Sequence, residues 1–197
     1  PEGGERSVYA VFWRNGVAIG RALLTADELP VPASAVGALA AFASARTLIT
    51  PAPRRGPATV DPTEISVVVC TRDRSADLRR CLAALSRCAP APGEIIVVDN
   101  APGVGGARAT VAEWPGVRLV EEPRPGLREA RNAGVRAALG AVIAFTDDDV
   151  EPPADWIGRL AAAMSDPDVV CVTGAVLPSD LSGEGACLFE FEFSGLD

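Results

Sequence analysis

Beyond residue 63 the chain alternates between continuous apolar runs and segments in which apolar residues recur at helical spacing. The runs are of strand length and rich in Val and Ile, a composition typical of strands that are buried on both faces. They predict five strands, at residues 64–70, 94–100, 117–122, 141–146 and 169–176.

Amphipathic segments lie between several of these runs and predict helices. In residues 75–88 the apolar residues are spaced i, i+3, i+4 and i+7, and Ser75 is the expected N-cap. Two further helices are predicted at residues 126–140 and 154–165. Buried strands separated by helices favour an α/β fold with a mostly parallel sheet and helices on both faces.

The residues before position 64 follow a different pattern. Two β-rich arms flank Asn15-Gly16 in residues 7–25 and predict a β-hairpin, because this pair supplies the positive φ angles of a type I′ turn. An alanine-rich stretch at about residues 33–48 predicts a helix. A proline-rich segment without apolar periodicity follows and predicts a linker. We therefore expect a hairpin-and-helix appendage, a linker and an α/β domain, at residues 1–49, 50–63 and 64–197.

The composition permits a folded core and narrows the class of partner. Of the 197 residues 48% are hydrophobic, and the net charge of -8 argues against nucleic acid as the partner. No apolar run reaches the roughly 18 residues needed to span a bilayer, and no secretory signal opens the sequence. Five cysteines without a C-x-x-C pair favour reduced thiols. We expect a cytoplasmic protein, with attachment to a membrane surface left open.

Two residue types are absent, and their absence excludes whole classes of chemistry. The sequence has no histidine, and all 18 basic residues are arginine. Ser-His-Asp and Cys-His catalysis, H-E-x-x-H zinc sites, Schiff-base chemistry and a P-loop lysine are therefore excluded within this chain. Its chemistry has to depend on carboxylates, arginines and backbone amides, with a hard metal ion as an optional addition.

Polar side chains follow four of the predicted strands. The carboxyl ends of parallel strands meet at one edge of the sheet, where ligands of open α/β sheets bind. The sequence therefore predicts a site at this edge. Its candidate residues are Thr71, Arg72, Asp73, Arg74, Asp99, Asn100, Glu121, Glu122, Arg124, Asp147, Asp148 and Asp149.

The run Asp147-Asp148-Asp149 places three like charges side by side, which repel one another unless something neutralises them. Mg²⁺ or Mn²⁺ would remove that cost, and such a cation bound by one or two carboxylates also carries substrate phosphates. The alternative is that the aspartates form a solvated turn and cap the helix that starts near Ala154.

Four blocks in this sequence, ISVVVCTRDR, EIIVVDN, RPGLREARNAGVRAA and VIAFTDDDVEPPADWI, resemble in order and spacing the nucleotide-binding half of the family 2 glycosyltransferases. These are inverting enzymes with a GT-A fold, and the resemblance covers about residues 64–180. It implies transfer of a sugar from a nucleoside-diphosphate sugar, with UDP as the commoner carrier. The acceptor is left open between a saccharide, a lipid and a small molecule.

The resemblance also implies roles for individual residues. Residues 71–74 would line the base and ribose, and Asp99 would accept a hydrogen bond from the edge of the base. Arg124 and Arg131 would lie near the diphosphate or order the helix beneath it. The simpler interpretations are that Asp99 ends a strand and begins a turn, and that Arg131 is a solvated charge on a helix face.

The aspartate run matches the D-x-D motif of the resembled family. Asp148 would lie near the ribose and sugar, with Asp147 also on the donor side. Asp149 is the expected principal ligand of Mn²⁺ or Mg²⁺, and Asp147 is the second.

A general base for the transfer is not found in the sequence. In the resembled family it lies in a later acidic motif, and Glu184, Glu190 and Glu192 stand in a different context. We therefore expect this chain to cover the donor-binding part, to bind the donor and to transfer the sugar poorly. The alternative is a non-catalytic nucleotide-binding or partner-docking module with a degenerate GT-A fold. A dinucleotide-binding domain is a weaker alternative, because no glycines follow the first strand.

Overall fold

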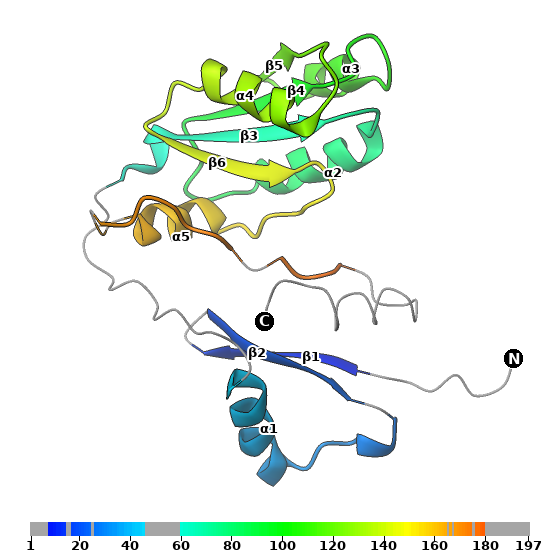
Figure 1. The fold of residues 1–197 in the computed structure, drawn as a ribbon, viewed down its shortest axis with the longest axis vertical. Coiled ribbons are helices and arrows are strands. Elements are labelled where there is room, and N and C mark those ends of the chain that lie inside the picture. The colour runs from blue at the N-terminus through cyan, green and yellow to red at the C-terminus, as the bar shows by residue number, and fades with distance from the viewer. Residues whose placement is uncertain are drawn as a thin grey trace, which may run out of the picture. The chain divides into compact units, whose positions relative to one another are not determined.

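The computed structural model describes residues 8–14, 17–24, 26–45, 60–164, 166, 168–174 and 176–179. The chain divides into two compact units (Figure 1). Residues 53–172 form one unit, and residues 1–52 with 173–197 belong to the other. The expected boundaries at residues 49 and 63 stay a prediction.

The amino-terminal unit contains the expected hairpin and helix. Strands β1 (Val8–Arg14) and β2 (Val17–Leu24) pair antiparallel, with Arg14 opposite Val17. A short 3₁₀ turn at Ala26–Glu28 and helix α1 (Ala33–Ala45) follow. The hairpin and the helix are confirmed, whereas the turn residues Asn15-Gly16 and the expected last helical residues, 46–48, lie outside the described residues.

The larger unit is built on a four-stranded parallel sheet. Its strands are β3 (Ile65–Thr71), β4 (Glu94–Asp99), β5 (Val117–Glu121) and β6 (Val142–Asp147), in the order β5-β4-β3-β6 (Figure 1). Thr71 pairs with Asp99, and Cys70 pairs with Asp147. The register therefore brings the polar ends of three strands to one edge of the sheet, as the sequence predicts.

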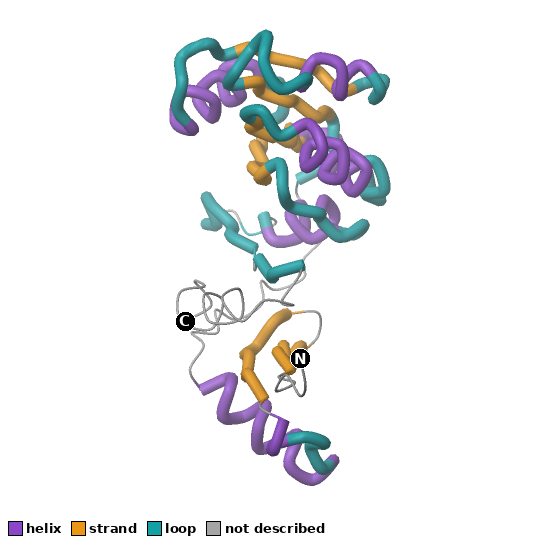
Figure 2. The backbone as a smooth tube through the Cα atoms, turned by 90° about the vertical axis from the view of Figure 1, so that its right-hand side faces the viewer, coloured by secondary structure: helices purple, strands orange, loops and turns teal. Residues whose placement is uncertain are grey.

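Helices cover both faces of this sheet, which confirms the predicted fold (Figure 2). Alternate residues of β3 point to opposite faces, because side chains alternate along a strand. Val67 and Val69 pack with α2 (Ser75–Leu85), α3 (Ala107–Ala112) and α5 (Trp156–Ala163). Val68 packs on the other face, against α4 (Leu127–Ala137).

Helix α4 approaches the sheet closely at Gly134. A Cβ atom added there would lie 2.4 Å from Cγ1 of the buried Val68, which leaves no room for a methyl group. The replacement Gly134→Ala gains helix propensity but forces apart a packed interface. We expect it to lower the free energy of unfolding by about 1–2 kcal/mol, measured by urea denaturation.

A matched control for this variant is Gly37→Ala in α1, where an added Cβ would meet nothing within 4 Å. This replacement should leave the protein as stable or slightly more stable. Equal effects of the two replacements would contradict the close packing of α4 on the sheet.

Three details of the sequence interpretation are wrong. Helix α2 begins at Ser75 itself, and its N-cap residue Arg74 makes no side-chain capping bond. Helix α3 is missing from the prediction, because Gly103, Gly105 and Gly106 favour a turn and the helix that follows is short. The strand predicted at residues 169–176 is not formed by residues 169–174 and 176. An apolar run becomes a strand only by pairing with a neighbouring strand, and none of the described strands pairs with these residues.

Within the ranges that the structure describes, no helix has the length and apolar character needed to cross a membrane.

Candidate functional site

An open pocket lies where the carboxyl ends of β3 and β6 meet the start of α4. Its volume is about 400 Å³. It therefore lies at the edge of the sheet where the sequence predicts a ligand site. The residues that line it are Cys70, Thr71, Arg72, Arg74, Asn100, Gly126, Leu127, Ala130, Asp147, Asp148 and Asp149.

Asp148 is the buried member of the aspartate run, with 5% of its surface exposed. The Thr71 hydroxyl donates a hydrogen bond of 2.7 Å to its Oδ2. Burial raises the pKa of Asp148, because its charged form loses contact with water, while the bond from Thr71 and the charge of Arg74 oppose this shift. Asp148 is therefore held in one position, where its charge is costly unless it is neutralised.

Asp147 and Asp149 extend from the end of β6 into solvent, with side chains 61% and 52% exposed. Arg74 Nη1 lies 3.1 Å from Asp149 Oδ2 and 3.5 Å from Asp148 Oδ1. Arg131 Nη2 lies 3.6 Å from Asp147 Oδ1, and its guanidinium stands 5.8 Å above the ring of Phe145. Two arginines thus balance most of the negative charge of the run.

The carboxylate oxygens of the aspartate run fit a hard divalent cation whose remaining ligands come from water and from the phosphates of a bound molecule. Among the residues that the structure describes, no three His, Cys, Asp or Glu side chains are grouped so that they alone could hold a metal ion. Phosphate-carrying Mg²⁺ takes only one or two carboxylates, with water and phosphate oxygens as its other ligands. The exposed carboxylates of Asp147 and Asp149, at the edge of the pocket, match this smaller set.

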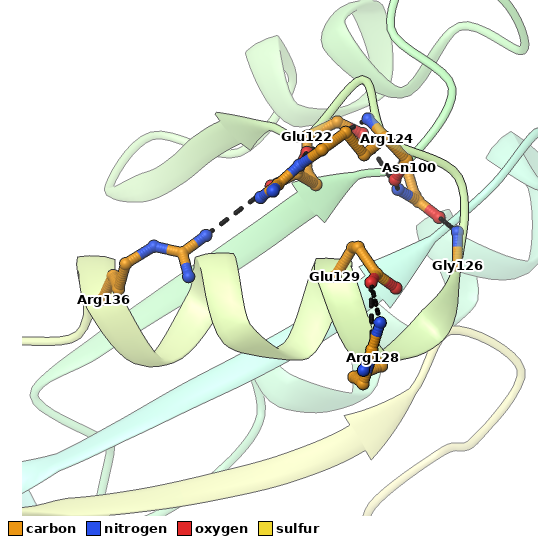
Figure 3. Close-up of polar contacts among 7 residues, drawn as sticks. All are labelled: Asn100, Glu122, Arg124, Gly126, Arg128, Glu129 and Arg136. Carbon is orange, nitrogen blue, oxygen red and sulfur yellow. Dashed lines mark hydrogen bonds and ion pairs between the residues drawn. The ribbon is translucent and has the colours of Figure 1, made fainter.

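Asn100, directly after β4, fixes the start of α4. Its side-chain amide donates hydrogen bonds to the backbone carbonyls of Glu122 (2.9 Å) and Arg124 (2.7 Å), and its Oδ1 accepts one from the Gly126 backbone amide (2.9 Å) (Figure 3). One buried side chain therefore joins the end of β4, the loop after β5 and the first turn of α4. Gly126 and Leu127, which this network holds, both line the pocket.

Glu122 binds the arginines of the same loop and helix. Its carboxylate accepts hydrogen bonds from Arg124 Nε (3.0 Å) and Nη2 (2.9 Å), and Arg136 Nη2 lies 3.6 Å away (Figure 3). The side-chain hydrogen bonds from Arg124 lower the pKa of Glu122 to about 2. Neither Glu122 nor Asn100 was assigned a role from the sequence, where only their place after a strand was a signal.

A carboxylate with a lowered pKa makes stability depend on pH. The stabilising contribution of Glu122 is present above the usual glutamate pKa of about 4.3 and is lost as the pH falls through about 2. We expect Glu122→Gln to lower the urea midpoint at pH 7 and the difference from the wild type to shrink between pH 4 and pH 2.

Glu121→Gln is the matched control, since this neighbouring glutamate is exposed and pairs only with Arg108 at the surface, at 2.7 Å, among the contacts described. It should change the midpoint little. A Glu122→Gln effect that stays constant across the acidic range would contradict the assigned ion pair.

The structure brings together most, but not all, of the residues expected at the site. Thr71, Arg72 and Arg74 line the pocket with the three aspartates. Asp73, between them, has a φ of 56° and lies against Gly105, where a Cβ would come within 2.4 Å of its Cα. Arg131 does not line the pocket itself but forms an ion pair with Asp147, which does.

Asp99 and Arg124 are not among the residues that line the pocket. Asp99 is 2% exposed and accepts a hydrogen bond of 2.9 Å from the Ala101 backbone amide. Arg124 is paired with Glu122. Both roles expected of Arg124, a contact with the diphosphate and the ordering of the helix beneath it, stay predictions.

Comparison with known proteins gives a family match over most of the larger unit. The model of the family described as "Glycosyl transferase family 2" matches residues 66–184. The glycosyltransferase AglE of Haloferax volcanii is 30% identical over 118 residues, which cover 57% of this chain and 39% of that protein. The pre-mycofactocin glycosyltransferase of Mycobacterium tuberculosis is 28% identical over 180 residues, 90% of this chain and 36% of that protein. The chain thus spans less than half the length of these relatives.

A solved structure supports the fold. The mannosyltransferase PcManGT from Pyrobaculum calidifontis, in complex with GDP-Man and Mn²⁺, aligns with a TM-score of 0.50 at 25% identity. The alignment covers 58% of this chain and 37% of that one. The parallel sheet with helices on both faces is therefore an α/β fold of the GT-A type.

Proposed function

The chain belongs to glycosyl transferase family 2, and from this premise we propose that the pocket at the ends of β3 and β6 binds a nucleoside-diphosphate sugar together with Mn²⁺ or Mg²⁺. The observation that carries the proposal is the aspartate run at the edge of the pocket. It combines one buried, fixed carboxylate with two exposed ones, and arginines stand beside it. Exposed carboxylates beside arginines would suit a divalent cation that is held together with a diphosphate.

Each residue of the run has a distinct part in the proposal. Asp149 is the principal ligand of the cation and Asp147 the second, because both are exposed beside the pocket. Asp148, held by Thr71, faces the ribose and sugar. A bound divalent cation would stabilise the negative charge that develops on the diphosphate when the sugar leaves.

In the proposal, residues at the ends of the neighbouring strands supply positive charge for the diphosphate and recognise the base of the nucleotide. Arg72 and Arg74 line the pocket and complement the charge of the diphosphate. The role of Asp99 in accepting a hydrogen bond from the base remains part of the proposal. Asn100 and Glu122 act through the loop before α4 and are positioning residues.

Transfer of the sugar with inversion is a proposal for the whole protein. No carboxylate of the described residues is assigned the role of general base. The proposal for this chain is donor binding, and it assigns no residue to the deprotonation of the acceptor.

The acceptor to test first is pre-mycofactocin. The family model begins at residue 66, whereas the match with the pre-mycofactocin glycosyltransferase covers 90% of the chain. That match has to include much of residues 1–65, because residues 185–197 are too few to account for the difference. Similarity in the unit outside the family model is the observation that favours a shared acceptor.

Calorimetric titration of UDP and GDP, each with Mn²⁺ and with EDTA, tests donor binding. We expect one of the two nucleotides to bind with a micromolar dissociation constant in Mn²⁺ and to lose at least tenfold in affinity in EDTA. A folded chain that binds no nucleoside diphosphate would instead support the non-catalytic docking module.

A further inference from the structure

Arg74 forms ion pairs with Asp148 and Asp149, and Asp149 is the carboxylate proposed above as the principal ligand of the cation. Arg74 lies three residues after the end of β3 and is the N-cap residue of α2. A single atom, Nη1, contacts both Asp149 Oδ2 at 3.1 Å and Asp148 Oδ1 at 3.5 Å. The carboxylate proposed as the principal metal ligand is therefore paired with a positively charged side chain in this structure.

A divalent cation and this guanidinium compete for the same oxygen atoms. Mg²⁺ binds carboxylate oxygens at about 2.0–2.1 Å, so a guanidinium left in hydrogen-bonding contact with that carboxylate would lie against a like charge. The Arg74 side chain is 54% exposed and can leave without opening the core. The hydrogen bond from Thr71 to Asp148 involves the other carboxylate oxygen, Oδ2, and does not depend on contact with Arg74.

The second arginine of the site, Arg131, makes a longer contact, and with the second proposed metal ligand rather than the principal one. Arg131 contacts Asp147, at 3.6 Å, and packs over the ring of Phe145. Its guanidinium is therefore held by a second contact on β6. Arg74 differs in having one nitrogen shared by the two carboxylates.

On the basis of the function proposed above, we infer that Arg74 is an exchangeable counter-ion. It neutralises Asp148 and Asp149 while the pocket is empty, and it moves to the diphosphate when the cation takes its place. Phosphate oxygens are good partners for a guanidinium, and Arg74 lines the pocket that would hold them. Cation and nucleotide then bind cooperatively, because each favours the same displaced position of Arg74.

Binding of Mn²⁺ alone, followed by the electron paramagnetic resonance signal of the free ion, tests this inference without any transfer reaction. Arg74→Gln removes the competing charge, and we expect it to bind Mn²⁺ without nucleotide about tenfold more tightly than the wild type. The same variant should bind UDP or GDP in saturating Mn²⁺ about tenfold more weakly, since it lacks the charge that moves to the diphosphate.

Two further variants separate competition from a general effect of charge. Arg79→Gln removes another half-exposed arginine of α2, which pairs with Glu113 at 2.8 Å, and should change neither affinity. Arg74→Lys keeps the charge and should bind Mn²⁺ alone as the wild type does. Circular dichroism verifies that each variant is folded.

The possible failures are distinguishable. If the wild type binds Mn²⁺ and nucleotide but Arg74→Gln binds Mn²⁺ no more tightly, the counter-ion exchange is wrong and the proposed function stands. If the wild type binds neither Mn²⁺ nor a nucleoside diphosphate, the proposed function fails and the exchange fails with it.

Discussion

Replacing Asp149 by alanine is expected to weaken Mn²⁺-dependent binding of nucleoside diphosphate by about 100-fold or more. Loss of groups that merely orient metal ligands costs about 10–100-fold in metal affinity, so loss of the principal ligand should cost at least the upper end of that range. The side chain is 52% exposed and its described partner is Arg74, so its removal should not unfold the protein. Calorimetric titration in Mn²⁺ measures the effect.

Asp155→Ala is the matched control for this replacement. Asp155 is also an exposed aspartate in an ion pair, with Arg159 at 2.6 Å, but it does not line the pocket. Its removal should leave nucleotide binding unchanged. Equal affinity of the Asp149→Ala variant and the wild type for nucleotide in Mn²⁺ would remove the aspartate run from the site.

Replacing Asn100 by alanine is expected to lower the free energy of unfolding by about 3 kcal/mol. The change leaves two backbone carbonyls and one backbone amide without the partner they have in the native protein, and each unsatisfied buried group costs about 1–3 kcal/mol before water or local movement compensates. The start of α4 should also shift, which weakens nucleotide binding under conditions where the variant remains folded. Urea denaturation and titration at low temperature measure the two effects.

Asn132→Ala supplies the comparison, since Asn132 is an exposed residue in α4. Its replacement should change the free energy of unfolding by less than about 0.5 kcal/mol. If Asn100→Ala has an equally small effect, the three hydrogen bonds do not hold the loop and helix as described.

The sheet could be predicted from the sequence because its strands are buried on both faces. Val67, Val68 and Val69 form a continuous apolar run, and in the structure all three are fully buried between two layers of helices. A run of this kind between amphipathic segments leaves few alternatives to a parallel sheet. Once the sheet is assigned, the position of the aspartates at its carboxyl edge follows directly.

The segment at residues 169–176 illustrates the limit of the same argument. Its composition favours a strand, but pairing depends on another backbone edge, which the local sequence does not contain. In the structure Val170 is 89% exposed, and the residues around it form no ladder with the described strands. The local pattern of apolar residues therefore predicts the tendency of a segment to form a strand, but it does not predict which strand the segment pairs with.

The positioning residues were missed for a related reason. Asn100 bonds to residues 22 to 26 positions further along the chain, and such contacts leave no periodic signal in the sequence. Arg124 is expected either near the diphosphate or in ordering the helix beneath it, and the local sequence does not show that its guanidinium contacts the carboxylate of Glu122 two residues earlier. The sequence identified which side chains reach the edge of the sheet, while their pairing depends on how the loops turn.

The most direct test of the donor site is a crystal structure of this chain grown with Mn²⁺ and the nucleoside diphosphate that binds, with anomalous scattering recorded for manganese. We expect one manganese peak beside the Asp149 carboxylate and the diphosphate next to it, between residues 71–74 and the first turn of α4. Manganese away from the aspartate run, or a nucleotide bound outside this pocket, would contradict the account.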